Sequence, residues 1–418
     1  MIIFYFNLFN IMKKYFIFAA AAIVAASCAK TPAPVQTPDG PEAPAVEGKE
    51  VIQFGSNVVA NVETKAAVEA WNGQQLLYIY GFPRVMKGEP ASLVTDYEHP
   101  YINNVKASAP TSDAENNKIE VIDASKSGNT TPYYYEGTTT YDFFGYYVQD
   151  AAVAVEDDAP KPTINGTNDG YELAIKIKGT QDIMTAIADP TSACDKVFGA
   201  DPTPRPEGWN DKYAFSAYAA RRGVQPILQF KHELTQLVFM VESGTNFTDA
   251  TQLHVIGVKI NNVPVNAKLC VAGANAGTGD GKAVTITDVK NESGKYDSSI
   301  DVYVDDDHIL ASGNAVKVPK ITEDAIAVGQ PVMLFPEESK YSVTLTVAQG
   351  TATSEVTADI TRDVMLDVNG TTPFQPGFSY KVTFKVYGLE SIDIKAELTP
   401  WQTGTPIDIN TDDKPTIE

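Results

Sequence analysis

The sequence predicts an all-β protein built from β-sandwiches. Short segments in which apolar and polar residues alternate recur roughly every eight to twelve residues, above all after Gly223, with Gly, Asn and Asp between them. Other segments are dense in aromatic, β-branched and threonine residues, which pack well on a pleated sheet. No long amphipathic helical pattern is visible. These features are typical of sandwiches rather than of a helical or α/β protein.

The chain begins with a predicted export signal. Lys13 and Lys14 precede an apolar run too short to span a bilayer, and the small residues Ala25, Ala26 and Ser27 stand directly before Cys28. A lipoprotein signal peptidase needs small residues there, because the backbone must come close to the thiol. We therefore expect residues 1–27 to be removed and Cys28 to be acylated. An ordinary secretory signal with an incidental Cys28 is the alternative.

The true start is Met1 or Met12, and residues 1–11 are apolar and uncharged. One longer anchor through both apolar runs would hold two lysines in its middle, which is costly. Residues 28–50 follow as a tether: residues 29–50 contain five prolines and almost no large apolar residue. Extended at about 3.1 Å per residue, this stretch would reach roughly 60 Å from a membrane.

Strands are expected throughout the first half of the remaining chain. A strand broken at Gly55 begins with Ile52 and Phe54, and three further strand segments cover residues 75–82, 133–147 and 171–178. Residues 180–188 and 212–220 are the expected short helical or irregular pieces.

The strand signal is sharper in the second half. One long strand, or two joined strands, cover residues 226–242. Later strands are expected at 253–261, 268–273, 284–289, 300–304, 332–335, 341–348, 354–360, 379–387 and 391–398. Placing a boundary near Arg222 gives two sandwich domains, residues 51–225 and 226–418.

Charge excludes several partners. The chain carries a net charge of −21, and residues 1–27 contain two lysines and no acidic residue, so the remainder carries −23. Such a surface repels nucleic-acid phosphates and anionic headgroups. Nucleic acid is therefore not expected as a partner, and lipid at Cys28 must hold the protein to a membrane.

No cofactor, metal centre or enzymatic motif is predicted. The four histidines are scattered at 99, 232, 254 and 308, and His232 has the setting of a core histidine. The glycine-rich stretch 271–282 (VAGANAGTGDGK) lacks the spacing and the Ser or Thr of a phosphate loop, so a hairpin loop is expected. The acidic run 304–308 lacks the glycine and distal glutamate of a calcium loop. Cys194 and Cys270 are either paired or free.

Tryptophans offer a further possible site, because their rings stack on sugars. Trp71 and Trp401 lie in strand-like segments and are expected in the core, whereas Trp209 is expected on a loop.

Four stretches together resemble the fimbrillin family of Bacteroidales, the FimA and Mfa-like pilins. They are a first strand ending in Glu63-Thr64-Lys65-Ala66 before Trp71, residues 141–147 followed by Asp182–Ala186, residues 230–241 (FKHELTQLVFMV), and residues 376–401 with their closing Pro-Trp. The resemblance implies two transthyretin-like sandwich domains and a pilus subunit. It also implies export as an outer-membrane lipoprotein, with other fimbrial subunits and a host or bacterial surface receptor as partners.

The resemblance further implies assembly by strand exchange. A protease cuts after the first strand, and a C-terminal strand from the next subunit fills the groove. Removing an edge strand would expose unpaired backbone groups and an apolar groove. Here Lys65 stands where the family usually has Arg, and Arg84 is a second cut candidate in an expected exposed loop.

The C-terminal segment has the pattern of a donor strand. Its apolar residues alternate with polar ones, so that one face of the strand is apolar. They are Ile392, Ile394, Ala396, Leu398, Ile407 and Ile409. The alternative is that this strand closes its own sheet. At the level of function, the alternatives are a surface glycan-binding lipoprotein and a fimbrial tip or anchor component that does not polymerise.

Overall fold

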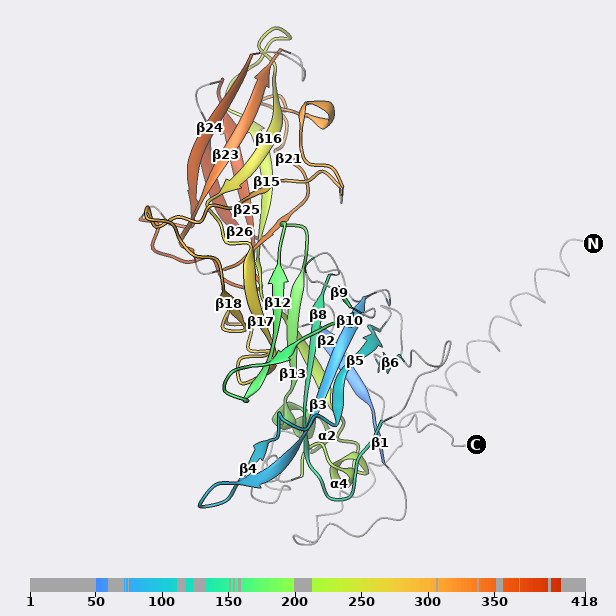
Figure 1. The fold of residues 1–418 in the computed structure, drawn as a ribbon. Helices are drawn as coiled ribbons and strands as arrows, with labels where there is room; N and C mark the ends of the chain where they lie inside the picture. Colours follow the sequence, from blue (N-terminus) through green and yellow to red (C-terminus); the bar gives the residue numbers. More distant parts are fainter. Residues whose placement is uncertain are drawn as a thin grey trace, which may run out of the picture. The chain divides into compact units, whose positions relative to one another are not determined.

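The structure is a computed structural model, and it describes most of the chain after residue 49 (Figure 1). The described residues are 50–58, 71, 73, 75–110, 118–122, 133–149, 152, 155–156, 159–198, 213–305, 307–336, 338–350, 356–367, 369–389 and 392–399. One compact unit, Ala43–Val197 with Gly208–Glu418, holds all the described strands. The prediction of an all-β protein is confirmed.

The N-terminal strands form a sheet that closes on itself. Its strand order is β4-β3-β5-β6-β2-β14-β13-β8, and β3 also pairs with β8, so seven of the eight strands form a ring to which β4 is added. The bounds are β2 Phe54–Val58, β3 Leu76–Lys87, β4 Ser92–Thr95, β5 Ile102–Ser108, β6 Lys118–Val121, β8 Tyr141–Val148, β13 Ile183–Ala188 and β14 Ile227–His232.

Three smaller groups of strands accompany the ring. A four-stranded sheet has the order β11-β12-β17-β18, with bounds Thr163–Ile164, Gly170–Lys176, Asn266–Gly273 and Val284–Ile286. Two short pairs join β1 (Val51–Ile52) to β7 (Tyr133–Tyr134) and β9 (Val155–Glu156) to β10 (Ala159–Pro160). Because β12 pairs with β17, and β17 in turn with β18, this sheet combines segments about one hundred residues apart in sequence.

The remaining strands form two five-stranded sheets. The first contains β15 Thr235–Ser243, β21 Ile326–Ala327, β22 Val332–Leu334, β25 Ser379–Val386 and β26 Ile392–Thr399, with β15 and β25 parallel. The second contains β16 Leu253–Asn261, β19 Ser299–Asp301, β20 Val316–Lys317, β23 Lys340–Gln349 and β24 Thr357–Met365. The strands of both alternate buried and less buried residues, as half-buried sandwich strands do.

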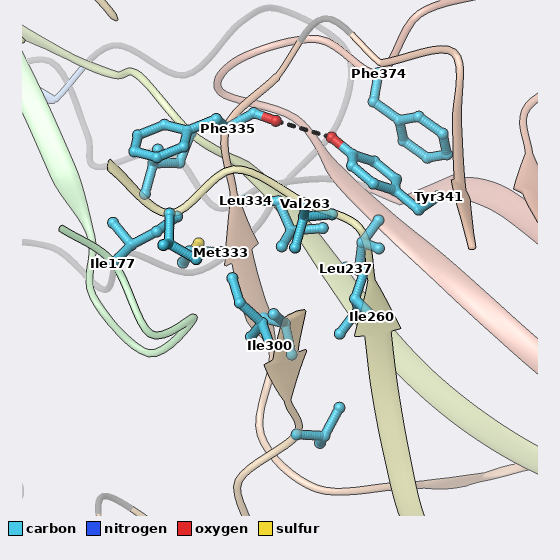
Figure 2. Packing of buried hydrophobic residues seen from close by; sticks show 14 of the residues in the cluster. Ile177, Leu237, Ile260, Val263, Ile300, Met333, Leu334, Phe335, Tyr341 and Phe374 are labelled. Carbon is cyan, nitrogen blue, oxygen red and sulfur yellow. Dashed lines mark hydrogen bonds between the residues drawn. The ribbon is translucent and has the colours of Figure 1, made fainter. Parts of the chain in front are cut away.

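Buried side chains from both of these sheets join in one hydrophobic cluster. Figure 2 shows part of it around Leu237, Ile260 and Met333. The Tyr341 hydroxyl donates to the carbonyl of Phe335 at 3.0 Å, which satisfies a polar group in an apolar surrounding. The burial makes this cluster the main source of stability.

Helices are few in the described part of the chain: α2 (Pro190–Phe198), α4 (Ala217–Ala220) and the 3-10 turn η2 (Ser312–Asn314). None of the described helices is long and apolar enough to cross a membrane. The helical expectation for residues 212–220 is confirmed by α4. That for residues 180–188 is wrong, because β13 occupies Ile183–Ala188. The predicted break at Gly55 is also wrong: Gly55 lies within β2, and the strand is interrupted at Gln53.

The boundary between residues 225 and 226 stays a prediction, and strand pairing favours a later position. β14 pairs with β13 and β2 in the closed sheet, whereas β15 pairs with β25. The chain therefore changes sheets after His232. The segment 226–242 is two joined strands, one of the two possibilities expected.

Candidate functional site

The strand β2, near the beginning of the described chain, has a hydrogen-bonded neighbour on each side. It runs parallel to β14, with Gly55 opposite Ile227, and antiparallel to β6, with Phe54 opposite Ile119. It is therefore an interior strand rather than the edge strand that was expected. Its removal would leave two unpaired edges and a groove between them, each with backbone groups in need of partners.

The inward face of this first segment is buried. Ile52, Phe54 and Ser56 alternate along the strand and are 5%, 2% and 0% exposed. The Phe54 ring meets the Phe143 ring edge to face, with centroids 5.2 Å apart. The Ser56 hydroxyl has no hydrogen-bond partner among the described residues, which is a costly arrangement in a core. The segment thus combines strong apolar burial with one unsatisfied polar group.

The C-terminal strand β26 lies at the edge of its sheet. It pairs antiparallel with β25, from Val386 opposite Ile392 to Ser379 opposite Thr399. No described strand pairs with its other edge. In an antiparallel ladder, half of the backbone groups of an edge strand point away from its neighbour and can receive another strand. In this structure the C-terminal strand closes its own sheet, the alternative weighed for it, with one edge left uncommitted.

Burial decreases along β26. Ile392 is 4% exposed, Ile394 and Ala396 are half-buried against the core, and Leu398 is 49% exposed. Leu398, the last apolar side chain of the strand, therefore gains little hydrophobic stabilisation from packing against its own sheet.

Charged side chains line the same strand and protect its edge. Lys395 and Lys381 both pair with Glu397, the latter at 3.6 Å. Charged residues on an edge strand oppose indiscriminate pairing with other chains.

Four of the predicted site residues lie outside the described residues: Cys28, Lys65, Ile407 and Ile409. Acylation, cleavage after Lys65 and the extension of a donor strand past Trp401 stay predictions. The structure does not bring the described candidates together at one site: Arg84 lies on β3, and Ile392, Ile394, Ala396 and Leu398 lie on β26.

The expectation that Arg84 lies in an exposed loop is wrong. Arg84 lies within β3, opposite Thr95 of β4. Its side chain is 18% exposed, donates to the Leu93 carbonyl at 3.2 Å and faces Asp142 at 3.5 Å. A paired strand presents a poor substrate to a protease, which needs an accessible extended segment.

A buried polar cluster lies where β14 passes into β15, and sequence reasoning did not find it. The His232 ring nitrogen Nδ1 lies 3.0 Å from a carboxylate oxygen of Asp182, which confirms the core histidine. Next to it, Glu233 is fully buried and accepts a hydrogen bond from the Thr185 hydroxyl. Burial raises the pKa of Glu233 to about 7.

The glycine-rich stretch 271–282 ends β17 and continues as a loop, as expected, and it reaches the same cluster. The backbone N–H of Gly277 donates to the Thr185 hydroxyl at 2.8 Å. A charged residue between two apolar strands, in the run FKHELTQLVFMV, was the only available sequence signal for Glu233. The loop contact carried no signal because it joins positions about ninety residues apart.

Of the two alternatives for the cysteines, the structure favours the unpaired one: Cys194, which is buried, and Cys270, which is half-buried, do not form a disulfide with each other. Trp71 is 3% exposed and packs edge to face on Tyr147 and Phe230, so its expected core role is confirmed. Trp209 and Trp401 lie outside the described residues.

Within the described residues, Asp96, Glu98 and His99 bring potential metal-ligand atoms within 4.8 Å of one another. An ordinary ion pair accounts for this arrangement. Asp96 contacts the His99 ring at 3.0 Å and lies 3.8 Å from the Lys87 ammonium.

Comparison with known protein families decides the affiliation of the second half of the chain. Residues 213–401 match the family model described as fimbrillin-like. This part of the chain is a fimbrillin-like domain. The match spans β14 to β26 and therefore includes the edge strand described above. It confirms the resemblance seen in the sequence.

Solved structures with partial likeness to this chain also exist. A protein from Bacteroides uniformis described as a cell adhesion protein has 16% identity and a TM-score of 0.46, covering 84% of this chain and 99% of its own. A fimbrial protein from Bacteroides vulgatus has 15% identity and a TM-score of 0.45, with coverage of 84% and 99%. TM-scores below 0.5 do not establish a shared arrangement. No curated protein matches the chain.

Proposed function

We propose that this protein is a structural or adhesive subunit of a surface fimbria. The match of residues 213–401 to the fimbrillin-like family carries the proposal. The all-β body agrees with a structural role, and the acidic net charge of −21 argues against a nucleic-acid partner.

Export as an outer-membrane lipoprotein is the first step of this proposal. The small residues before Cys28 and the proline-rich stretch after it support acylation at Cys28 and a tether over residues 28–50. Replacing Cys28 with Ala is expected to release the protein from membrane fractions. Unchanged partition into detergent would show that lipid at Cys28 does not anchor it.

Assembly by strand exchange is the second step. Cutting after Lys65 separates β1 and β2 covalently from the rest of the chain, and the vacated groove between β14 and β6 then receives a C-terminal segment of another subunit. The uncommitted edge and decreasing burial of β26 support the C-terminal segment as the mobile partner. The incoming strand would gain backbone hydrogen bonds on two sides.

A cleavage experiment tests this step. The chain without residues 1–28 is treated with a limiting amount of a trypsin-like protease and followed by size-exclusion chromatography. Polymers are expected to appear together with the cut near Lys65. Replacing Lys65 with Gln is the matched control and is expected to prevent both the cut and the polymers.

Two deletions locate the donor. Removing residues 390–418 is expected to abolish polymers, but this deletion also removes the buried Ile392. Removing residues 400–418 leaves β26 intact: loss of polymers then assigns the donor to the segment beyond β26, and their persistence assigns it to β26 itself. Stable monomers at every concentration after a complete cut near Lys65 would contradict strand exchange and favour a tip or anchor role.

A further inference from the structure

A cavity of about 240 Å³ opens on the small sheet that joins β12 to β17. Its wall includes Tyr97, which precedes β5, residues of the β11–β12 turn, and the beginning of the glycine-rich loop after β17. This is smaller than the roughly 300–1,000 Å³ of pockets that take drug-sized ligands. The cavity therefore has room for about one small ring.

A β-bulge shapes the floor of this cavity. Opposite β12, Glu172 pairs with Cys270 and Tyr171 pairs with Ala272, so that Val271 is the extra residue on β17. Bulges re-aim side chains and occur frequently beside binding sites.

Two facing glycines end the same ladder. A Cβ at Gly170 would lie 2.4 Å from the Ala272 carbonyl oxygen. Gly273 has φ +138°, and a Cβ there would lie 3.3 Å from the Cα of Gly170. Side chains on these two residues would push the strands apart, so this floor depends on glycine at both positions.

Both walls are held in place by their own hydrogen bonds. In the β11–β12 turn, the Asn165 amide and the Thr167 hydroxyl each donate to Asp169 at 2.6 Å. In the loop after β17, the Thr278 hydroxyl donates to the Asn275 carbonyl at 3.0 Å and to Asp280 at 2.6 Å. A site whose walls are ordered before binding loses less entropy when a ligand arrives.

Tyr97 is also fixed. Its ring packs on Phe82 and Phe144, with centroids 5.0 and 6.2 Å away. The neighbouring Glu98 accepts a hydrogen bond from Asn168 of the β11–β12 turn at 3.1 Å, which ties the two walls together. Tyr97 thus supplies an immobile aromatic surface with a polar end.

The charges of the lining cancel. Asp169 and Glu172 contribute two carboxylates, and Lys268 and Lys282 contribute two ammonium groups. Lys268 pairs with Glu172 at 2.9 Å, and Lys282 pairs with Asp280, a neighbour outside the lining. An anion in the cavity would face both carboxylates, and a cation would face both ammonium groups, so neither sign of charge is favoured.

The hydrogen-bonding groups of the lining are mixed in kind. Carboxylates accept, ammonium groups donate, and the Asn275 amide and the Thr285 hydroxyl do both. The side-chain amide of Asn275 and the hydroxyl of Thr285 form no hydrogen bond with another described residue. Hydroxyl groups, which also donate and accept, are the ligand chemistry that matches such a lining, above all with charge-assisted bonds available.

From these observations we propose that the cavity binds a single neutral sugar ring. Asp169, Glu172, Lys268 and Asn275 bond its hydroxyl groups, and Tyr97 supports its apolar side. The inference goes beyond the fimbrial role and does not depend on strand exchange, since the cavity lies wholly within one chain.

Cys270 in the cavity wall gives a direct readout. The chain without its signal, carrying Cys28→Ser, is treated with iodoacetamide, and modification at Cys270 is followed by peptide mass spectrometry. Burial raises the pKa of the Cys270 thiol to about 11, so the reaction is slow and is best measured at alkaline pH. The fully buried Cys194 serves as the internal control for unfolding.

The probes are glucose, galactose, mannose, fucose and N-acetylglucosamine, with glycine, lysine and glutamate as charged comparators. At ten times the dissociation constant of a binding sugar, modification of Cys270 is expected to slow by roughly tenfold. The charged comparators are expected to leave the rate unchanged.

Two variants at exposed alanines provide the matched test. Ala274 lines the cavity, and Ala274→Trp fills it, whereas Ala311→Trp adds the same ring at an exposed position outside the lining. Protection by sugar, together with saturation transfer to the sugar protons in NMR, is expected to disappear in A274W and to persist in A311W. The proposal is wrong if no sugar protects Cys270 at about 0.1 M, well above a millimolar dissociation constant. Protection by the charged comparators alone, or protection that survives in A274W, would equally overturn it.

Discussion

The hydroxyl of Thr185 donates a hydrogen bond to the carboxyl group of Glu233, and neither side chain is exposed to solvent. The same hydroxyl accepts the Gly277 N–H at 2.8 Å, so three distant parts of the chain meet at one oxygen. The second carboxyl oxygen of Glu233 has no partner among the described residues. Burial, and to a lesser extent Asp280, opposes a negative charge there, and the Thr185 hydroxyl and Lys231 compensate for it only in part.

The free energy of unfolding is therefore expected to fall as the pH rises through the range in which Glu233 loses its proton. The pKa of Glu233 is about 7 in the folded protein, against an ordinary value of 4.5. Between these values the folded state binds more protons than the unfolded state, so the free energy of unfolding decreases with rising pH. The stabilisation that protonated Glu233 contributes is fully present below about pH 4.5 and is lost above about pH 7.

Replacing Glu233 with Gln is expected to remove this dependence. The amide keeps a hydrogen-bond acceptor for Thr185 and carries no charge, so at pH 8 the variant should be more stable than the parent by about 1–3 kcal/mol. Urea denaturation at pH 5 and pH 8 measures the difference, and Glu120→Gln on the exposed face of β6 is the control. An equal difference at both pH values would show that the folded and unfolded proteins bind the Glu233 proton equally well, so that the pKa of Glu233 is not raised by folding.

Gly277 is expected to tolerate no side chain. Its φ is +69°, and a Cβ would lie 2.5 Å from the backbone nitrogen of Ile187, which cannot rotate away. Gly277→Ala should lower the free energy of unfolding by roughly 2–4 kcal/mol. Gly294 has nearly the same φ, +72°, with nothing within 4 Å, so Gly294→Ala should cost only about 1 kcal/mol. Equal costs in denaturant titrations would mean that the loop does not rest on β13.

The two ends of β26 are expected to differ in stability. Ile392 is 4% exposed and Leu398 is 49% exposed. Ile392→Ala should cost about 2–4 kcal/mol, because it leaves a cavity in the core, and Leu398→Ala less than about 1 kcal/mol. Hydrogen exchange should likewise be faster at the Leu398 end. Similar costs for both variants would contradict the decrease in burial along the strand.

Two strands of the second half, β16 and β25, could be predicted closely because their burial alternates, whereas β24 at Thr357–Met365 lies several residues beyond its expected range of 354–360. Leu253–Asn261 coincides with its expected range, and the strand Ser379–Val386 differs by one residue. Each has one face in the core and one nearer solvent, so apolar and polar residues alternate in its sequence with a period of two.

β13 escaped prediction for the opposite reason. In Ile183–Ala188 five of the six residues are buried, so no alternation is left to read. The missed helix α2 did carry a signal. Asp189 precedes Pro190 and accepts bonds from the N–H groups of Thr191 and Ser192, which is the pattern of an N-cap followed by proline.

The sites depend on contacts that no local pattern encodes. The apolar alternation of β26 was visible, but its edge position follows from the pairing of β25 with β15. Likewise, Glu172 and Cys270 meet at one cavity only because β12 pairs with β17. The edge position of β26 and the make-up of the cavity wall both follow from long-range strand pairing, which residue type alone does not reveal.

The last prediction concerns the noncovalent contacts that keep the first strand in its sheet. Phe54 is 2% exposed and packs against Phe143, so Phe54→Ala should cost about 3–5 kcal/mol. After a cut near Lys65, only noncovalent contacts of this kind retain β1 and β2. The cut segment should therefore leave faster in F54A than in the parent, and polymers, if strand exchange occurs, should form sooner.

Phe239→Ala is the matched control for this effect. Phe239 is 1% exposed on β15 and stacks on Phe384 at 5.6 Å, so its loss should cost a similar free energy far from the first strand in sequence. Mass spectrometry of the size-exclusion fractions would follow the retained segment in both variants. Faster loss in F54A alone indicates that β2 is held by its own core contacts. Equal acceleration in both variants would mean that the segment leaves by global unfolding, and the groove between β14 and β6 would then not persist long enough to receive another strand.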